Sequence, residues 1–488
     1  MSASERYARS STLADSEFRD DISLKRLSGS TNSSNTDLSQ LLLSEHEHDE
    51  HFPGLPPQDV GRGAWSFLLG IWLLEATLWG FPLAFGVFQS YYSSLPEFKN
   101  DKNIPTIGAL TISLSYLGVP VTNAIALRYP HIQRYMIVFG WLGTLLSLIL
   151  ASFATEVWHL ILTQGFMYGF MWVIGYGPFL LWIPDWFNKR RGLAFGIFFG
   201  ASGISGLILP FILESSCHRF GFRNTLRCFV VFTIFFSGPG LFLVRPRTPV
   251  GHPEHHTFSS SPKASASEIP KPIPNKYAFL RNPYIYFFAL AVFLQGLAFF
   301  LPPIFLPSFS TSLGLSHTTG DVLLAINSLA QVTGQMLLGH FSDKMHPHIP
   351  TTVATLFSGL AALLLWGPAK TFTPLAVFSG IWGFFAGSYS VLWYRAIGHL
   401  THSHAELYTV YGWCSFERGL SMLLAGPIAA GLLGHEVVRE EYGLGMFKNL
   451  VIFSVVTLLI STTTGFAFLF EWFVERRKGY VRAAVGEE

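Results

Sequence analysis

Apolar stretches of about 20 residues recur along this chain, and their repetition limits the possible folds more than any other feature. A helix of about 20 residues crosses the ~30 Å hydrocarbon core of a bilayer. Backbone polar groups in lipid must be hydrogen-bonded within their own segment, so each stretch predicts a transmembrane helix. The predicted spans are 65–90, 105–127, 135–154, 157–183, 192–214, 226–244, 284–308, 319–341, 351–369, 373–396, 408–434 and 449–474. The expected fold class is an all-α membrane protein with twelve transmembrane helices.

The composition agrees with a membrane protein and argues against other classes. Of the 488 residues, 50% are hydrophobic and only 13% are charged, which is too little charge to cover a soluble protein of this length. The formal net charge is +2, and Lys and Arg are scattered between apolar runs, so no nucleic-acid partner is expected. The three cysteines, Cys217, Cys228 and Cys414, give neither a disulfide framework nor metal-ligand spacing. We expect no cofactor and no metal in the site.

A polar segment, 245–281, divides the predicted spans into two sets of six. It is rich in Pro, Ser, His and Lys, which is typical of a flexible linker. The halves share short patterns: Glu75 lies seven residues before Pro82, and Gln295 lies seven before Pro302. Duplicated halves are a recurring transporter design, with the substrate site between them. The expected domains are a disordered tail (1–64), a first six-helix bundle (65–244), the linker (245–281), a second bundle (282–475) and a C-terminal tail (476–488).

The distribution of positive charge predicts which side of the membrane each loop faces. The loops at 128–134, 188–191 and 342–344, together with the linker, carry more Lys and Arg than the opposite set of loops. These loops and both termini are therefore expected in the cytosol. We expect a multi-pass monomer in the plasma membrane. The stretch "DLSQLL" (37–42) fits an acidic dileucine sorting pattern, which makes a vacuolar or endosomal membrane the alternative.

Several stretches resemble the major facilitator superfamily and, within it, the monocarboxylate transporter branch in a fungal form. "WGFPLAFGVFQSYY" (79–92) is similar to the branch's first helix, and 118–153 resembles its second and third helices. "WFNKRRGLAFGIFFGASGISG" (186–206) is similar to its signature at helix five. "LLGHFSDK" (337–344) resembles the superfamily's loop motif after helix eight, and "ERGLSMLLAGPIAAGLL" (417–433) resembles helix eleven. The resemblance implies a major facilitator fold of two six-helix bundles and a secondary active transporter, not an enzyme.

The residues that couple a proton to a small carboxylate in that branch are missing here. The resemblance places Leu83 where the branch has a first-helix lysine. It places Gln331 and Gln335 where the branch has an aspartate and an arginine in helix eight. The acidic opening motif survives only loosely as "DVGRGAW" (Asp59 to Trp65). The resemblance therefore does not identify a substrate.

Two charged residues lie deep inside predicted spans, where ionisable groups usually face a cavity or a partner. Glu75 and Arg418 each lie about ten residues into their spans from the same side, which places both about 15 Å deep. A buried carboxyl group holds its proton when alone and releases it beside a cation, as proton-linked transport requires. We interpret Glu75 as the proton carrier and Arg418 as the group that binds an anionic substrate or Glu75. The alternative is a permanent structural ion pair, or two charges that are each paired elsewhere.

Amide side chains give further candidate substrate contacts. Asn327, Gln331 and Gln335 follow one face of the eighth span at intervals of four residues. This stripe indicates either substrate contact or hydrogen bonding between helices. Gln295 is added because its position in the second half corresponds to that of Glu75.

An aromatic stripe lies in the fourth span. Tyr168, Trp172 and Tyr176 follow one helix face. Such stripes are more often core, but aromatic walls are also typical of small-molecule sites.

The stretch 187–211 combines positive charge with small residues and predicts a gate. Gly196, Gly200, Gly203 and Gly206 are spaced so that another helix can approach closely, either as fixed packing or as a moving contact. The residues expected to close the cytosolic side are Lys189, Arg190, Arg191, Asp343 and Arg395.

Most of the 17 histidines fall in predicted cytosolic segments, including 45–51, 252–256, His346, His348 and 399–404. Metal binding there would need ligand spacing that the sequence does not show. No phosphate loop or catalytic triad appears in a suitable context. We therefore expect a transporter that moves a small organic solute, a monocarboxylate-like anion or a secondary metabolite, by alternating access with protons as a candidate partner. A non-transporting nutrient sensor on the same scaffold is the alternative.

Overall fold

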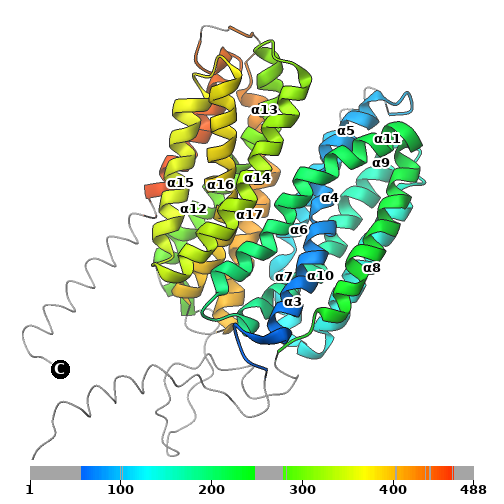
Figure 1. Ribbon diagram of the computed structural model, residues 1–488, viewed down its shortest axis with the longest axis vertical. Helices are drawn as coiled ribbons and strands as arrows, with labels where there is room; N and C mark the ends of the chain where they lie inside the picture. Colours follow the sequence, from blue (N-terminus) through cyan, green and yellow to red (C-terminus); the bar gives the residue numbers. More distant parts are fainter. Residues whose placement is uncertain are drawn as a thin grey trace, which may run out of the picture. The chain divides into compact units, whose positions relative to one another are not determined.

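The computed structural model shows an almost entirely helical chain (Figure 1). It describes residues 56–98, 101, 103–247, 278–281, 283–401, 404–434, 436–438, 441–463 and 465. The sorting pattern at 37–42, most of the expected tail and linker, and the segment 476–488 lie outside these residues. All described residues belong to one unit that begins at Pro56.

The first half forms helices whose breaks coincide with prolines and glycines. The elements are α3 (Gly61–Leu78), α4 (Gly80–Leu83), α5 (Phe85–Ser94), α6 (Ile104–Leu117), α7 (Val119–Arg128), η1 (Pro130–Ile132), α8 (Gln133–Ala151), α9 (Val157–Leu160), the π-helix η2 (Ile161–Met167), α10 (Tyr168–Trp186) and α11 (Arg191–Leu243). Pro82 lies in α4 and Pro120 in the first turn of α7. Proline cannot donate the helical hydrogen bond, which accounts for the breaks beside Pro82 and Pro120, whereas α10 continues through Pro178 and Pro184.

The second half repeats this arrangement. Its elements are η4 (Ala278–Arg281), α12 (Pro283–Phe299), α13 (Leu301–Ser312), α14 (His317–Lys344), α15 (His348–Ala361), the π-helix η5 (Ala362–Trp366), α16 (Phe372–Leu400), α17 (His404–Leu432), η6 (Tyr442–Leu444) and a helix at Lys448–Thr463. The break between α12 and α13 precedes Pro302, as the break between α3 and α4 precedes Pro82. The shared pattern predicted from the sequence therefore corresponds to a shared helix break.

The element α11 differs from the prediction, which placed a loop between spans 192–214 and 226–244. Helical backbone runs from Arg191 to Leu243 and is interrupted only at Gly221, with φ 74° and ψ 162°. Glycine is essentially the one residue that adopts this region without strain. The two predicted spans are therefore two limbs of α11 joined at Gly221 without a loop.

The all-α membrane fold is confirmed. Among the described residues, nine helices are long and apolar enough to cross a membrane, and one of these, α11, contains two limbs. Helices α17 and Lys448–Thr463 correspond to the eleventh and twelfth predicted spans. Together these helices account for all twelve predicted spans.

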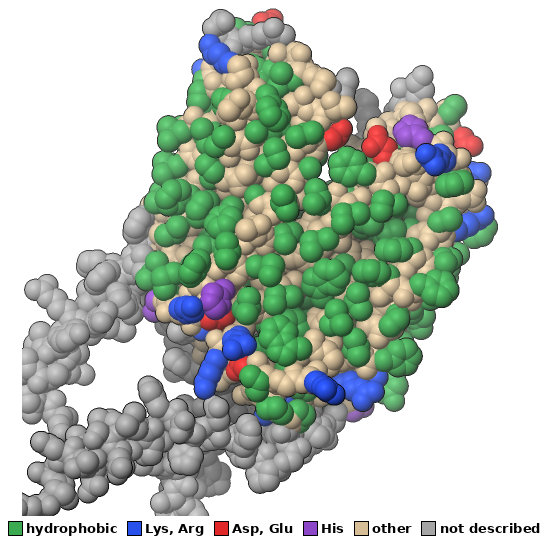
Figure 2. Space-filling model, in the orientation of Figure 1, with side chains coloured by type: hydrophobic (Ala, Val, Ile, Leu, Met, Phe, Trp, Pro, Cys, Tyr) green, Lys and Arg blue, Asp and Glu red, His purple; other side chains and the backbone are tan. Residues whose placement is uncertain are grey.

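The surface shows where lipid would surround the helices. Figure 2 shows hydrophobic side chains over the middle of the visible face, with charged side chains near its two ends. Exposed large apolar residues include Phe139, Phe235, Leu364 and Trp413. A belt of this kind would be a liability in water and is expected in a bilayer.

The buried core shows where the halves meet. We call the end that carries residues 56–60, 187–190 and 345–347 the linker end. One apolar cluster fills the first half and continues into the second through parts of α12, α16 and α17 near the linker end. A separate cluster, made of second-half residues alone, fills the rest of the second half. The halves therefore share their core toward the linker end.

Helices α11 and α14 approach each other through the glycines of α11. A Cβ at Gly203 would lie 2.6 Å from Val332 Cγ2, and one at Gly196 would overlap the Gln335 carbonyl oxygen. Small residues permit such close approach between membrane helices. The glycines that weaken an isolated helix therefore lie where the first half contacts the second.

Candidate functional site

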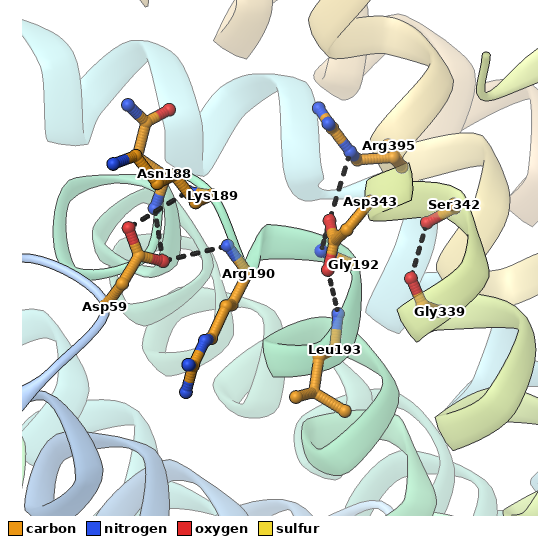
Figure 3. Close-up of polar contacts among 10 residues, drawn as sticks. All are labelled: Asp59, Asn188, Lys189, Arg190, Gly192, Leu193, Gly339, Ser342, Asp343 and Arg395. Carbon is orange, nitrogen blue, oxygen red and sulfur yellow. Dashed lines mark hydrogen bonds and ion pairs between the residues drawn. The ribbon is translucent and has the colours of Figure 1, made fainter. Parts of the chain in front are cut away.

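The Asp343 carboxylate joins the two halves at the linker end (Figure 3). Asp343, near the end of α14, accepts hydrogen bonds from the backbone N–H groups of Gly192 (2.7 Å) and Leu193 (2.9 Å) at the start of α11. Arg395 Nε of α16 lies 3.4 Å from the same carboxylate. First-turn N–H groups lack helical partners, and the positive end of the helix dipole attracts an anion. An aspartate of the second half thus caps a helix of the first.

Asp59 holds the adjacent loop in a similar way, but within the first half. Its carboxylate accepts hydrogen bonds from the backbone N–H groups of Asn188 (3.0 Å), Lys189 (2.9 Å) and Arg190 (2.8 Å). The Asp59 N–H donates to the Trp186 carbonyl at 2.9 Å. Asp59 has φ 61°, a left-handed conformation that aspartate tolerates better than most residues. The first residue of "DVGRGAW" therefore fixes the loop before α11, a role that the sequence analysis did not identify.

The three cations of this loop lie in different environments. The Lys189 and Arg190 side chains are exposed, whereas Arg191 is buried. The Arg191 guanidinium packs against the backbone of Gly398 on α16 and interacts electrostatically with Tyr408. Arg191 therefore reaches the second half.

Other contacts cross between the halves near the linker end. The Tyr408 hydroxyl of α17 donates to the Leu181 carbonyl at 2.9 Å, and Asn123 Nδ2 donates to the Tyr408 carbonyl at 3.3 Å. Phe195 of α11 stacks on Tyr394 of α16, with ring centroids 5.1 Å apart. Hydrogen bonds and stacked rings thus close this end of the interface.

Glu75 lies in α3 and is 0% exposed. Neither carboxyl oxygen has a hydrogen-bond partner among the described residues. The side chain interacts electrostatically with Tyr116, Tyr168, Tyr176 and Tyr394. Of these tyrosines, Tyr394 belongs to the second half.

Arg418 lies on α17 and is 1% exposed. Its Nη1 donates to Gln295 Oε1 at 2.6 Å. The guanidinium carbon lies 5.3 Å from the centroid of the Phe299 ring and 5.9 Å from that of Tyr389. Its Nε and Nη2 have no hydrogen-bond partner in the part of the chain that the structure describes. The Tyr116 hydroxyl is a further hydrogen-bonding neighbour of this side chain.

Tyr116 of α6 interacts with both charged residues. No ion pair joins Glu75 to Arg418 among the described residues, so a permanent pair does not explain them. Tyr116 interacts electrostatically with each, and its ring packs edge-on against Trp79 with centroids 5.4 Å apart. A Cβ at Gly419 would lie 2.9 Å from the Tyr116 Cβ. The Tyr116 side chain therefore packs against α17 at the residue that follows Arg418. Tyr116 thus connects the surroundings of the acid and the cation.

Comparison with known families identifies the chain. The profile of the Major Facilitator Superfamily matches residues 117–416 and 288–486. The two matches cover more than half of the chain. The chain belongs to the major facilitator superfamily.

The chain is similar in sequence to fungal proteins that are named as transporters. The MFS transporter asaE of Aspergillus flavus is 25% identical over 414 residues, which cover 85% of this chain and 88% of that protein. The agnestins efflux protein AgnL12 of Paecilomyces divaricatus is 27% identical over 324 residues, which cover 66% and 70% of the two chains. The superfamily and these names support a membrane transporter.

A solved structure shares the fold. The human organic anion transporter MFSD10 (TETRAN) matches with a TM-score of 0.55 and 14% identity, over 82% of this chain and 99% of that chain. At this identity the match shows the fold of the superfamily and nothing about the substrate.

The aromatic stripe of α10 divides into two environments. The Tyr168 hydroxyl donates to the Leu78 carbonyl at 2.5 Å, the carbonyl that Pro82 cannot pair by helical hydrogen bonding. Trp172 and Tyr176 pack together with ring centroids 5.1 Å apart. Tyr168 therefore has a structural role at the helix break, while contact of all three with substrate stays a prediction.

The amide stripe of α14 faces α16. Gln335 Nε2 donates to the Gly387 carbonyl at 3.2 Å, and the Gln331 side chain packs against the same glycine. The backbone of Asn327 packs against Gly383. This placement favours hydrogen bonding between helices, one of the two interpretations left open by the sequence, over substrate contact in this conformation.

Metal binding finds no support in the part of the chain that the structure describes. These residues contain no group of three or more His, Cys, Asp or Glu side chains that could hold an ion. The His-rich segments 45–51 and 252–256 lie outside the described residues. Near the linker end, the rings of His346 and His348 lie 5.2 Å apart, and burial lowers the pKa of the His346 imidazole.

Proposed function

We propose that this superfamily member moves a small organic anion across the membrane by alternating access between its halves. The conformation described here is closed at the linker end. Opening that end requires the Asp343 cap on α11 to be released and the close contact of α11 with α14 to separate. Rocking of two related bundles about a central site is a common transporter mechanism.

The proposal rests on the incomplete hydrogen bonding of the two buried charged residues, Glu75 and Arg418. Burying a cation or a carboxyl group without full compensation costs several kcal/mol, and such groups inside a membrane usually serve a function. Arg418 has two unpaired donor atoms, and Glu75 has no hydrogen-bond partner among the described residues. A substrate carboxylate that binds the two Arg418 donors would satisfy them.

Glu75 provides a site for a coupled proton within this proposal. Glu75 and Arg418 do not pair with each other, but both interact with Tyr116. Movement of one half against the other changes the distance between Glu75 in α3 and Arg418 in α17. A carboxyl group takes up a proton in apolar surroundings and releases it when a cation approaches, so this movement can link proton and anion transport.

The substrate class follows from the groups around Arg418. Gln295, Phe299 and Tyr389 surround the guanidinium with one amide and two aromatic rings. Such surroundings suit a monocarboxylate with an apolar or aromatic body, such as a secondary metabolite.

The experiment is transport in proteoliposomes, with a panel of small monocarboxylates and aromatic acids measured by mass spectrometry. We expect Arg418→Ala to lower uptake at least about tenfold, because each lost charged hydrogen bond is worth about 1.5–3 kcal/mol. Arg223→Ala, which removes a cation exposed at the surface and 3.4 Å from Glu97, is the matched control. Full transport by Arg418→Ala would reduce Arg418 to a packing residue.

The same vesicles test the proton. Uptake by the wild type is expected to rise when the side of entry is acidified, and Glu75→Gln should abolish this pH response while anion exchange remains. Glu97→Gln at the exposed Arg223 pair is the control. An unchanged pH response in Glu75→Gln would assign coupling to another group.

The orientation is a separate proposal. The excess of Lys and Arg in the loops at the linker end supports a cytosolic location for that end, for both terminal tails (1–64 and 476–488) and for the linker 245–281. A glycosylation acceptor inserted in 248–277 should stay unmodified, and one inserted at 433–438 should be glycosylated. The reverse pattern would overturn the orientation. We also propose a monomer in the plasma membrane, which native mass spectrometry and fluorescence imaging can check.

A further inference from the structure

Two acidic residues lie in α11 and α14 near the end of the helices opposite the linker end, which we call the far end. Glu214 belongs to the first limb of α11, and Asp321 lies in the second turn of α14. Both side chains are exposed. Neither takes part in an ion pair among the described residues. One carboxylate therefore belongs to each half, and neither is neutralised by a cation there.

The glycine contacts give the register of the two helices. A Cβ at Gly192 would overlap the Gly339 carbonyl oxygen, and one at Gly203 would lie 2.6 Å from Val332 Cγ2. Residue numbers rise along α11 while those of its neighbours fall along α14. The two helices are therefore antiparallel.

Glu214 and Asp321 lie equally far beyond the last of these contacts. Glu214 follows Gly203 by 11 residues, and Asp321 precedes Val332 by 11 residues. Eleven residues make about three helical turns, so each carboxylate lies on the helix face that makes the contact. The one non-helical residue of α11, Gly221, comes after Glu214. The two acidic residues therefore occupy facing positions on the two halves.

The halves are apart at this level. At Gly206, the nearest α14 atom to an added Cβ is Ser328 Oγ, at 3.7 Å. The apolar cluster that the halves share lies toward the linker end. Figure 2 shows a hollow between the halves at the far end, with acidic side chains on both sides of it. The facing positions of Glu214 and Asp321 are thus separated in this conformation.

Other titratable groups near Glu214 lie on its own helix and on α5. His218 is one turn further along α11 and exposed, with its ring centroid 6.0 Å from that of Tyr91 in α5. Arg219 lies five residues from Glu214, about 140° around the helix. Cys217 is buried in the core of the first half. Of these groups, His218 is the one that shares a helix face with Glu214.

The elements around Asp321 add few charges. His317 begins α14, one turn before Asp321. Helices α5 and α13, and α16 before Arg395, contain no Lys, Arg, Asp or Glu. Lys370 precedes α16 and is exposed. The two carboxylates are therefore the acidic groups that the facing helices α11 and α14 carry at this level.

Closure of the far end would bring these carboxylates together, because it draws α11 against α14 beyond Gly206. Two carboxylates in one site repel each other, and such a pair binds a proton more tightly than a single carboxylate in water. Closure is then accompanied by proton uptake. A state that takes up a proton becomes more populated as the pH falls.

We propose, on the basis of the alternating access proposed above, that Glu214 and Asp321 form a like-charge pair that holds the far end open at neutral pH. Protonation of one member of the pair lets that end close. The pair acts on the conformation of the protein and does not contact the substrate. It is distinct from Glu75, which is buried in α3.

Double electron–electron resonance measures the opening of the far end directly. Spin labels are attached to Ser93→Cys at the end of α5 and Thr373→Cys at the start of α16, both exposed. The full-length protein carries alanine at Cys217, Cys228 and Cys414 and is measured in detergent without substrate. A long distance should dominate at pH 8, and a shorter distance should gain severalfold in population at pH 5. A distance distribution that does not change with pH would overturn the proposal.

Charge variants assign the response to the pair. Glu214→Gln combined with Asp321→Asn should populate the shorter distance already at pH 8 and remove most of the pH response. Glu97→Gln removes an exposed carboxylate that lies 3.4 Å from Arg223, and should leave the response as in the wild type. A full pH response in the double variant would contradict a role of the pair.

Two further variants separate the pair from other titrating groups. Glu75→Gln and His218→Asn should each retain the pH-dependent change in distance. Loss of the change in Glu75→Gln would assign it to the coupled proton, and loss in His218→Asn would assign it to the imidazole; either result would overturn the proposal. The outcome of the transport assay with Arg418→Ala does not affect these distances, so failure of the proposed substrate site and failure of the pair are told apart.

Discussion

Asp59 and Asp343 bind neighbouring backbone groups of the same short segment, but they come from different halves. Asp59 accepts three N–H groups from residues 188–190 and belongs to the first half, as they do. Asp343 accepts two N–H groups from residues 192–193 and belongs to the second half. In the proposed alternating-access cycle, the Asp59 contact can persist, whereas the Asp343 contact must break when the linker end opens. Under this proposal, similar hydrogen bonds serve stability at Asp59 and control of access at Asp343.

A substitution in the close contact between α11 and α14 should have the largest effect on closure of the linker end. Gly196→Ala would place a methyl group against the Gln335 carbonyl, where neither backbone can move cheaply. We expect a cost of about 1–3 kcal/mol to the closed state, as for other overpacked sites. Gly86→Ala adds the same methyl group where nothing lies within 4 Å, and serves as the control.

Access at the linker end is the measurement. A Leu407→Cys reporter lies in a pocket between the halves, lined also by Arg191 and Tyr394, and should react with a soluble maleimide when that end opens. Cys217, Cys228 and Cys414 are first replaced by alanine. Faster labelling is expected with Gly196→Ala and not with Gly86→Ala. Equal labelling in both would show that α11 and α14 need not touch for closure.

Asp343→Asn tests the second aspartate by removing the negative charge that binds the start of α11 from the other half. It weakens two charged hydrogen bonds to the start of α11 and the contact with Arg395. We expect the closed state to lose about 1.4 kcal/mol, which is about a tenfold change in the ratio of closed to open molecules. Labelling of the same Leu407→Cys reporter should rise accordingly, with little change in the melting temperature. A fall in melting temperature without faster labelling would contradict a gating role.

Asp59→Asn should give the opposite pattern and the smallest effect. Asparagine also tolerates a left-handed backbone, so the change removes charge without adding strain at φ 61°. Loss of part of this cap is expected to destabilise the fold by about 1 kcal/mol, seen as a lower melting temperature. Labelling of Leu407→Cys should stay at the wild-type rate. If Asp59→Asn opened the linker end, the two aspartates would not differ as proposed.

The fold was predictable because the signals that set it are local or periodic. Each span shows its own apolar length, and the break before Pro82 has its counterpart before Pro302. The sequence also singled out Glu75, Gln295 and Arg418 as polar groups within predicted spans, where such groups are rare. Gln295 proved to contact Arg418 directly. The monocarboxylate-like branch stays a prediction.

Other parts of the site could not be read from the sequence because they depend on contacts between distant segments. Tyr116 and Tyr389 are ordinary aromatic residues in apolar helices, and only packing places them beside Arg418. The amide stripe of α14 was visible, but its direction was not, because polar residues can face another helix or a cavity. Asp59 lies in a weakly matched motif, and its partners are more than a hundred residues away.

The turn at Gly221 gives α11 a mechanical property. Its first limb packs on α14, and its second limb exposes Phe232, Phe235 and Phe242 on the surface expected to meet lipid. Because no loop separates the two limbs, a displacement of the second limb is transmitted to the first through Gly221. In the proposed cycle, the thickness and lateral tension of the bilayer would therefore bear on how readily the two halves separate.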